Sequence, residues 1–162
     1  MNIGDSISGA LFSEDRLHRF VLWRIWDKHK SPFLFVGLNP STAAELKNDP
    51  TVFRLINFGK NWGYGGLFAV NLKPIISPVP YVLAEPAADK YLVQNDEIIK
   101  DARNLCSVAV VGWGDYAKDL QTRVKEVLVL LGKPVYCIKV NKSGQPCHPL
   151  YLPADCQIIT YQ

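Results

Sequence analysis

The stretch Phe33-Leu-Phe-Val-Gly-Leu-Asn-Pro-Ser-Thr42 joins a short apolar run to a polar turn. Four apolar residues bounded by Pro32 and Gly37 are typical of a buried central strand. In the turn, the glycine lets the backbone approach a ligand, and Pro40 stiffens the loop that holds Asn39. The stretch therefore predicts a strand that ends at a binding site.

Two other polar residues stand just past apolar runs. Asn71 ends Phe-Ala-Val-Asn (68–71), and His148 lies in Cys-His-Pro-Leu-Tyr-Leu (147–152). In open α/β sheets, ligands bind outside the carboxyl ends of the strands. We therefore expect Asn39, Asn71 and His148 to meet around one cavity, where two carboxamides and an imidazole could read a heterocycle and act on it.

The rest of the chain alternates between strand-like and helix-like segments. Strands are expected at 18–26, 33–36, 67–71, 108–112, 135–138 and 157–160, and helices at 41–47, 49–61, 89–104 and 114–131. This order predicts one α/β domain over residues 1–162, with a mostly parallel central sheet of four to five strands and helices on both faces. Residues 1–30 are expected to be an N-terminal extension packed on that core, although 13–28 could also form a helix.

Composition and charge narrow the possible functions. A hydrophobic content of 48% and a charged content of 20% are ordinary for a globular chain of 162 residues. The net charge of +3 is compatible with a polyanionic partner but too small to indicate one alone. No apolar stretch approaches the ~20 residues of a membrane span, and residues 1–10 lack an export signal. We therefore expect a cytoplasmic protein without a membrane partner; no protein partner is predicted.

The cysteines lack the spacing of a zinc finger or a Cys-x-x-Cys pair. Two interpretations stay open for Cys106, Cys137, Cys147 and Cys156. They are either four free thiols or part of a metal or iron–sulfur site that includes His148. The first interpretation is favoured for a cytoplasmic chain, so no metal and no cofactor are expected.

Each candidate site residue also has a structural interpretation. Asn-Pro is a common turn starter, and a buried asparagine such as Asn71 can bond to backbone. Asp49 can cap the helix that follows it or supply a carboxylate to the site. The residues Trp62, Tyr64 and Trp113 lie in glycine-rich turns and either contact a ligand or only shape those turns.

Basic and hydroxyl residues beside these loops suggest contacts to phosphates. The candidates are Ser41, Lys73, Lys142 and Ser143. Solvated surface lysines are the alternative interpretation.

Several motifs recur in the order of one known family and cover nearly the whole chain. They are Gly-Leu-Asn-Pro-Ser-Thr-Ala (37–43), Asp-Pro-Thr (49–51), Gly-Tyr-Gly-Gly (63–66), Val-Asn-Leu (70–72), Gly-Trp-Gly (112–114) and Gly-Gln-Pro-Cys-His-Pro-Leu-Tyr-Leu (144–152). The chain resembles the bacterial and phage domain-of-unknown-function family 1643. That label supplies no activity.

More remotely, the chain resembles the uracil-DNA glycosylase superfamily, which implies a uracil-DNA-glycosylase-like fold. By this resemblance Asn39 would position the attacking water, Asn71 would read the base and His148 would be the His of the second motif. The base-binding set would also include Gly37, Leu38 and Pro40. Leu150 replaces the serine that usually follows His-Pro in that superfamily, so a bulkier or modified base is expected.

The resulting expectation is a DNA base N-glycosylase-like hydrolase. It would flip a natural or modified pyrimidine from DNA and excise it, in repair or phage defence. His148 would stabilise the departing base, and Asp49 would supply basicity or stabilise the sugar cation. Two alternatives stay open: a non-catalytic module that binds nucleic acid or nucleotide, and an enzyme acting on free nucleosides or nucleotides.

Overall fold

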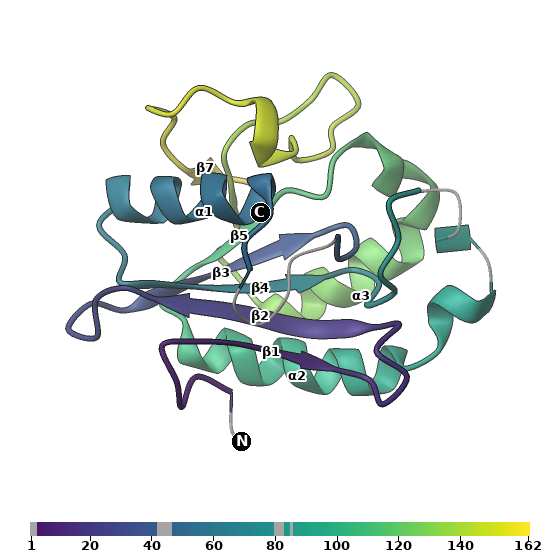
Figure 1. Cartoon of the computed structure of the whole chain (residues 1–162). Helices are drawn as coiled ribbons and strands as arrows, with labels where there is room; N and C mark the ends of the chain where they lie inside the picture. Colours follow the sequence, from purple (N-terminus) through teal and green to yellow (C-terminus); the bar gives the residue numbers. More distant parts are fainter. Residues whose placement is uncertain (1–2, 42–46, 80–82, 85) are drawn as a thin grey trace.

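The structure is a computed structural model that describes residues 3–41, 47–79, 83–84 and 86–162. Its centre is a seven-stranded sheet with the spatial order β1-β2-β4-β3-β5-β6-β7 (Figure 1). The strands are β1 (Ser8–Phe12), β2 (Arg19–Ile25), β3 (Pro32–Gly37), β4 (Gly66–Asn71), β5 (Ala109–Val111), β6 (Tyr136–Cys137) and β7 (Ile159–Thr160). The α-helices of the described residues are α1 (Pro50–Asn61), α2 (Leu92–Leu105) and α3 (Gln121–Leu131). The 3-10 turns of the described residues include η2 (Pro86–Asp89), η3 (Asp115–Leu120) and η4 (Pro149–Tyr151).

The sheet is mixed rather than mostly parallel. The pairs β3–β4, β3–β5 and β5–β6 are parallel, whereas β1–β2, β2–β4 and β6–β7 are antiparallel. The expectation of a mostly parallel sheet of four to five strands with a uracil-DNA-glycosylase-like fold is therefore wrong. The apolar alternation of a strand shows which residues face a core, but it does not show the direction of the neighbouring strand.

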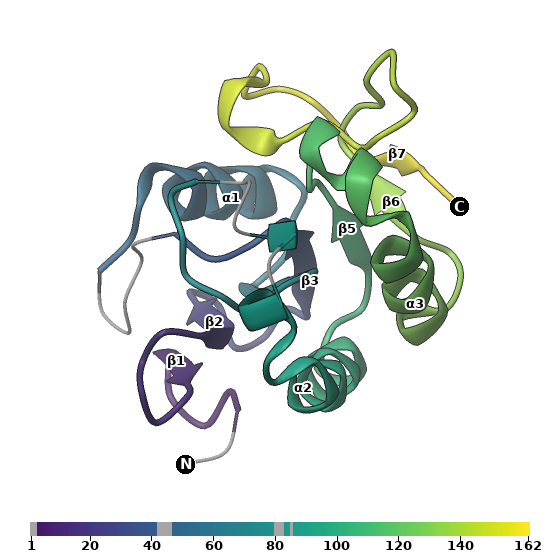
Figure 2. The same ribbon diagram turned by 90° about the vertical axis from the view of Figure 1, so that its right-hand side faces the viewer.

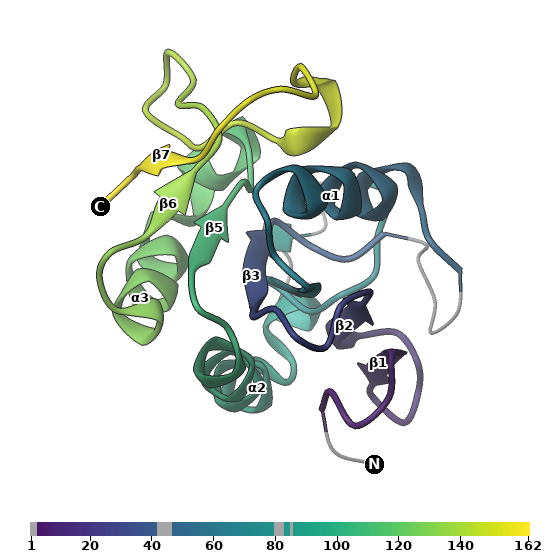
Figure 3. The same ribbon diagram turned by 90° about the vertical axis from the view of Figure 1, so that its left-hand side faces the viewer.

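Helices cover both faces of the sheet, with α1 on one side and α2 and α3 on the other (Figures 2 and 3). Successive side chains of β3 point to opposite faces, so Phe33 and Phe35 pack in the same cluster as α1. Leu34 and Val36 pack in the cluster that contains the inner faces of α2 and α3. Both faces of β3 are therefore buried, as its continuous apolar run predicts.

Several expected elements differ from those observed. The helix expected at 41–47 falls largely on residues 42–46, which lie outside the described residues. The helix expected from residue 89 begins at Leu92, because Tyr91 adopts a left-handed conformation with φ 68°. The helix expected from residue 114 begins as the 3-10 turn η3 and becomes regular at Gln121. Residues 3–30 contribute two strands to the sheet, and β2 lies between β1 and β4.

The segment after β6 returns over α1, where its course is visible above the helix in Figure 1. Three side chains of α1 and its C-cap hold it by donating to backbone carbonyls. Arg54 donates to Leu152, Asn61 Nδ2 to Ala154 at 3.2 Å and Trp62 Nε1 to Cys156 at 2.8 Å. These bonds hold the loop that carries His148 close to the carboxyl ends of the central strands.

Candidate functional site

A cavity of about 620 Å³ opens where β3, β4 and β5 end. Asn39, Asn71 and His148 all line it, although they lie far apart along the chain. Its position outside the carboxyl ends of the parallel strands is the usual place for a ligand in such sheets. Its volume lies within the range of small-molecule sites, about 300–1,000 Å³.

Asn71 presents an uncommitted carboxamide to this cavity. It is the last residue of β4, pairs with Gly37 of β3 and is only 6% exposed. Its backbone carbonyl accepts a hydrogen bond from Asn95 Nδ2 at 3.0 Å. Its side chain makes no hydrogen bond with any residue that the structure describes. Because a buried amide without a partner is costly, this donor and acceptor pair is suited to a ligand.

His148 is held in one orientation by the turn that it starts. Its Nδ1 accepts a hydrogen bond from the backbone N–H of Leu150 at 3.3 Å. Nδ1 therefore acts as the acceptor, which assigns the proton of the neutral ring to Nε2. Burial lowers the pKa of His148 below its usual value, although the carboxylate of Asp49 acts in the opposite direction. Near pH 7 the ring is neutral and offers an Nε2–H donor to the cavity.

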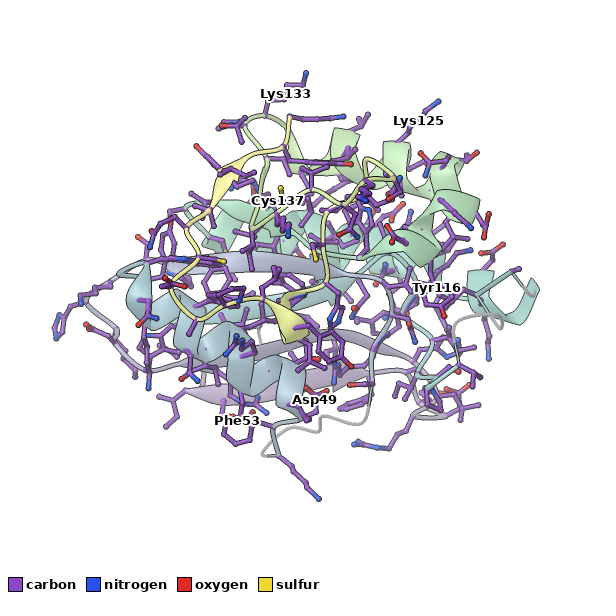
Figure 4. The ribbon with its side chains drawn as sticks, turned by 90° about the horizontal axis from the view of Figure 1, so that it is seen from above. Asp49, Phe53, Tyr116, Lys125, Lys133 and Cys137 are labelled. Carbon is purple, nitrogen blue, oxygen red and sulfur yellow. The ribbon has the colours of Figure 1, made fainter. Side chains whose placement is uncertain are left out.

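Asp49 is the buried carboxylate of the site, at 8% exposure. It is the N-cap of α1, and its Oδ1 accepts the backbone N–H of Val52 at 2.8 Å. Its Oδ2 accepts a hydrogen bond from the hydroxyl of Ser41. In Figure 4 it is labelled at the end of α1 beside η4. Both oxygens thus accept hydrogen bonds within the protein, and these bonds hold the carboxylate in one orientation.

Asn39 holds two loops of the cavity together. Its Nδ2 donates to the backbone carbonyl of Ser77 at 2.7 Å and lies near those of Pro40 and Ile75 at 3.2 and 3.4 Å. The carbonyl of Pro40 in turn accepts the N–H of Ser77 at 3.3 Å. The Nδ2 of Asn39 therefore has the structural role that an Asn-Pro turn suggests. The Oδ1 remains available to accept a hydrogen bond from water or a ligand.

Aromatic rings line the apolar part of the cavity. Phe35 of β3 lies two residues before Gly37 and lines the cavity together with Trp113. A Cβ atom at Gly112 would lie 2.8 Å from the ring of Phe35, so only glycine allows this close approach. The indole Nε1 of Trp113 donates to Gln145 Oε1 at 2.9 Å, which fixes its ring. Sequence reasoning missed Phe35, although its alternation with Gly37 puts it on the same face of β3.

Arg19 is a second cavity residue that sequence reasoning missed. It begins β2 and is 4% exposed. No motif marks it, because it lies on an antiparallel strand whose place beside β4 was not predicted. Burial lowers the pKa of Arg19 to about 10, so the guanidinium stays charged at neutral pH.

Two predicted ligand contacts, Trp62 and Tyr64, lie away from the cavity. Both rings pack on Phe33 at the start of β3, with ring centroids 5.5 and 5.6 Å from it. They come just before β4, whereas Asn71 ends that strand, so the six residues of β4 separate them by about 20 Å. Their position before β4 could have excluded Trp62 and Tyr64 from the site, because Asn71 lies at the other end of that strand.

The two lysines predicted to contact phosphates, Lys73 and Lys142, lie in different environments. Lys73 is buried and paired with Asp89 in a separate cleft that also contains Arg123 and Glu126. Burial lowers the pKa of Lys73, and the nearby Arg123 lowers it further. Lys142 is exposed on the loop that also carries Asn141, a residue of the cavity lining.

The loop of residues 141–144 is tied to the segment after β5. Ser143 Oγ and Asn141 Nδ2 both donate to Asp115 Oδ1, the latter at 2.9 Å. Asp115 and its exposed neighbour Tyr116 also line the cavity. Among the predicted binding residues, Gly37, Leu38 and Ser41 lie on the lining, whereas Pro40 shapes the loop through its backbone.

The four cysteines are free thiols, and Cys147 lines the cavity. Burial raises the pKa of Cys137 to about 11. Within the described ranges, no group of three or more His, Cys, Asp or Glu residues could hold a metal ion. No helix in the described part of the chain is long and apolar enough to cross a membrane.

Comparisons with known proteins give one match. Residues 19–150 match the model of a family described as "Protein of unknown function (DUF1643)". No curated protein and no solved structure matches the chain. The matched region contains β2 and the α-helices α1, α2 and α3. It also contains every residue that lines the cavity except Tyr151, the residue directly after it.

Proposed function

The chain belongs to the DUF1643 family, which carries no assigned activity, and from its site we propose that the cavity binds a nucleobase and hydrolyses its N-glycosidic bond in DNA. One observation carries the proposal. The Asn71 carboxamide and the His148 Nε2–H face one cavity without a protein partner among the described residues, beside the rings of Phe35 and Trp113. An amide that reads an edge, an N–H donor and aromatic rings match the chemistry of a flat heterocycle.

Hydrolysis breaks the C1′–N bond, and the electron pair of that bond stays with the base. The neutral ring of His148 carries a proton on Nε2 and can donate a hydrogen bond to the departing base. This hydrogen bond stabilises the negative charge that grows on the base. The Asp49 carboxylate acts electrostatically on the imidazole. Its negative charge also stabilises the positive charge that develops on the sugar. Water adds to C1′, with the Oδ1 of Asn39 as its acceptor, and its proton ends on the base or in solvent.

The decisive experiment is excision from labelled oligonucleotides that each carry one natural or modified pyrimidine. Excision leaves an abasic site, which alkali converts into a strand break. We expect breaks at one class of base, a loss of at least about 100-fold in rate for His148→Ala, and a similar loss for Asn71→Ala. Variants of the separate Lys73 cleft serve as the control because they lie outside the cavity. Unbroken DNA for every base would refute the catalytic role.

A second candidate is a non-catalytic module that binds a nucleotide or nucleic acid in the same cavity. It is favoured by the hydrogen bonds of Asp49, whose two oxygens are both occupied, and by those of Asn39, whose amide nitrogen holds a loop. These bonds hold both side chains in structural positions, which is suited to binding. Binding that depends on Asn71, with no abasic product at any base, would select this candidate.

A further inference from the structure

Arg19 is a buried cation on the wall of the cavity that neither candidate function uses so far. It is 4% exposed, and its backbone N–H donates to the carbonyl of Pro74 at 2.8 Å. This bond fixes the start of β2 against the segment that follows β4. The side chain is directed to the cavity lining, where it is joined by Asn71.

Arg19 and the proposed base-reading residue Asn71 lie on neighbouring strands and line the same cavity. Leu22 of β2 pairs with Ala69 of β4 in an antiparallel ladder. That ladder ends at Leu22, the pairing of β2 with β1 shifts register between Val21 and Arg19, and the Arg19 N–H meets the carbonyl of Pro74. The two side chains are therefore brought together by the cavity that both line, and not by direct cross-strand pairing.

The guanidinium offers chemistry that the other polar groups of the cavity lack. Asn39 and Asn71 are neutral amides, and His148 is a neutral imidazole near pH 7. A guanidinium fork matches a phosphate with two parallel hydrogen bonds, and Arg19 keeps its charge although burial lowers its pKa to about 10. The N-terminus of α1 is not counted here, because Asp49 already accepts the N–H of Val52.

Resting on the nucleobase site proposed above, we propose that Arg19 binds the phosphate of the nucleotide whose base Asn71 holds. The ligand is then a nucleotide, free or within DNA, rather than a base or a nucleoside. The cavity of about 620 Å³ has room for this larger ligand. The negative charge of Asp49 acts on Arg19 and weakens the attraction of this site for an anion. The positive charge of the nearby Arg24 has the opposite effect.

The test compares ligands that differ only in the phosphate. Calorimetry with the full chain measures the affinity for 2′-deoxyuridine, 2′-deoxycytidine and thymidine, and for their 5′- and 3′-monophosphates. We expect one of the two monophosphate series to bind about tenfold more tightly than the nucleosides, with a preference that weakens as salt is added. The preferred series identifies which phosphate the guanidinium contacts.

Two variants assign that preference to Arg19. Arg19→Gln removes the charge and is expected to make nucleoside and monophosphate bind equally, whereas Arg19→Lys keeps the charge, loses the fork and retains part of the preference. Arg24→Gln is the matched control. Arg24 is a buried guanidinium of the same strand that donates to Asn48 and to the carbonyls of Gly9 and Trp23, and it does not line the cavity. Its variant should keep the full preference.

The outcomes separate this proposal from the one on which it rests. Equal affinity of wild-type protein for nucleosides and monophosphates overturns the role of Arg19, and this result needs no variant to fold. If nucleosides still bind and Asn71→Ala abolishes their binding, the base site stands. If no nucleoside or monophosphate binds and no DNA is cut, the base site itself is refuted. Loss of the preference in Arg24→Gln as well would also count against the assignment.

Discussion

Gly37 and Asn71 are register partners at the ends of β3 and β4, and the side-chain oxygen of Asn71 fills the space that a side chain at position 37 would need. A Cβ atom there would lie 2.8 Å from Asn71 Oδ1. The glycine of the Gly-Leu-Asn-Pro turn thus leaves room for the Asn71 amide, the proposed contact to the base. This contact links the first motif of the chain to the second.

The variant Gly37→Ala tests that contact. The obstructed atom is the far end of a side chain, so Asn71 can rotate away at small cost and the free energy of unfolding should change by less than about 1 kcal/mol. Ligand affinity should fall at least about tenfold, because the rotated amide no longer meets the base. Chemical denaturation and calorimetry with the preferred ligand measure the two quantities.

Gly65, which directly precedes β4, provides a comparison for the Gly37→Ala variant. At Gly65 a Cβ atom would collide with the backbone carbonyls of Asp27 and Lys30, which cannot rotate away. Gly65→Ala should therefore destabilise the protein by several kcal/mol, about the range of severe core substitutions. A Gly37→Ala protein as unstable as Gly65→Ala would contradict the explanation given for Gly37.

The pH dependence of stability should contain a contribution from His148. Burial lowers its pKa in the folded state below the ordinary 6.5, so the unfolded chain binds more protons in the interval between the two values. Stability therefore falls as the pH drops below about 6.5, by at most about 1.4 kcal/mol per pH unit. Protonation of Nδ1 would also break the bond from the Leu150 N–H. Urea unfolding between pH 5 and 8 should be flatter in His148→Gln, and an unchanged slope would oppose this assignment.

Asp49 should influence both α1 and His148, and two variants separate these effects. Asp49→Ala removes the cap that accepts the Val52 N–H and should cost about 1–2 kcal/mol of stability. Asp49→Asn retains a capping oxygen but removes the charge that raises the pKa of His148. An NMR titration of His148 should therefore give a lower pKa in Asp49→Asn. A pKa equal to that of the wild type would show that the carboxylate does not act on the ring.

The two lysines predicted to contact phosphates should behave differently. Lys142 is exposed beside the cavity, so Lys142→Ala should weaken DNA binding and reduce the slope of log affinity against log salt by about 0.9. Lys73 is buried and paired with Asp89 in another cleft, so Lys73→Met should leave that slope unchanged. Fluorescence anisotropy over a series of salt concentrations measures both slopes. A reduced slope in Lys73→Met would place DNA over the other cleft.

Local signals in the sequence predicted much of the site. Asp49-Pro-Thr predicted the capped start of α1, and the Asp49 side chain does accept from Val52. The apolar run before Gly37 predicted β3, and the three polar residues Asn39, Asn71 and His148 do line one cavity, although His148 comes from a loop well past β6. The roles of Asn39, Asn71 and His148 in binding and chemistry stay predictions.

Other features depend on contacts between distant segments. The antiparallel course of β2 put Arg19 into the cavity, and nothing in the residues 18–26 indicates which strand they will pair with. Lys73 follows Asn71 by only two residues, yet its pairing with Asp89 places it in a different cleft.

The sequence by itself determined the buried strands, the capped helix α1 and the polar residues at the strand ends, because these depend on apolar periodicity and on hydrogen bonds between residues close in the chain. Only the tertiary structure decided the direction of the edge strands, the presence of Arg19 and Phe35 in the cavity and the exclusion of Trp62 and Tyr64 from it. Strand pairing is fixed by packing and backbone hydrogen bonds between segments far apart in the sequence, and no local pattern contains that information.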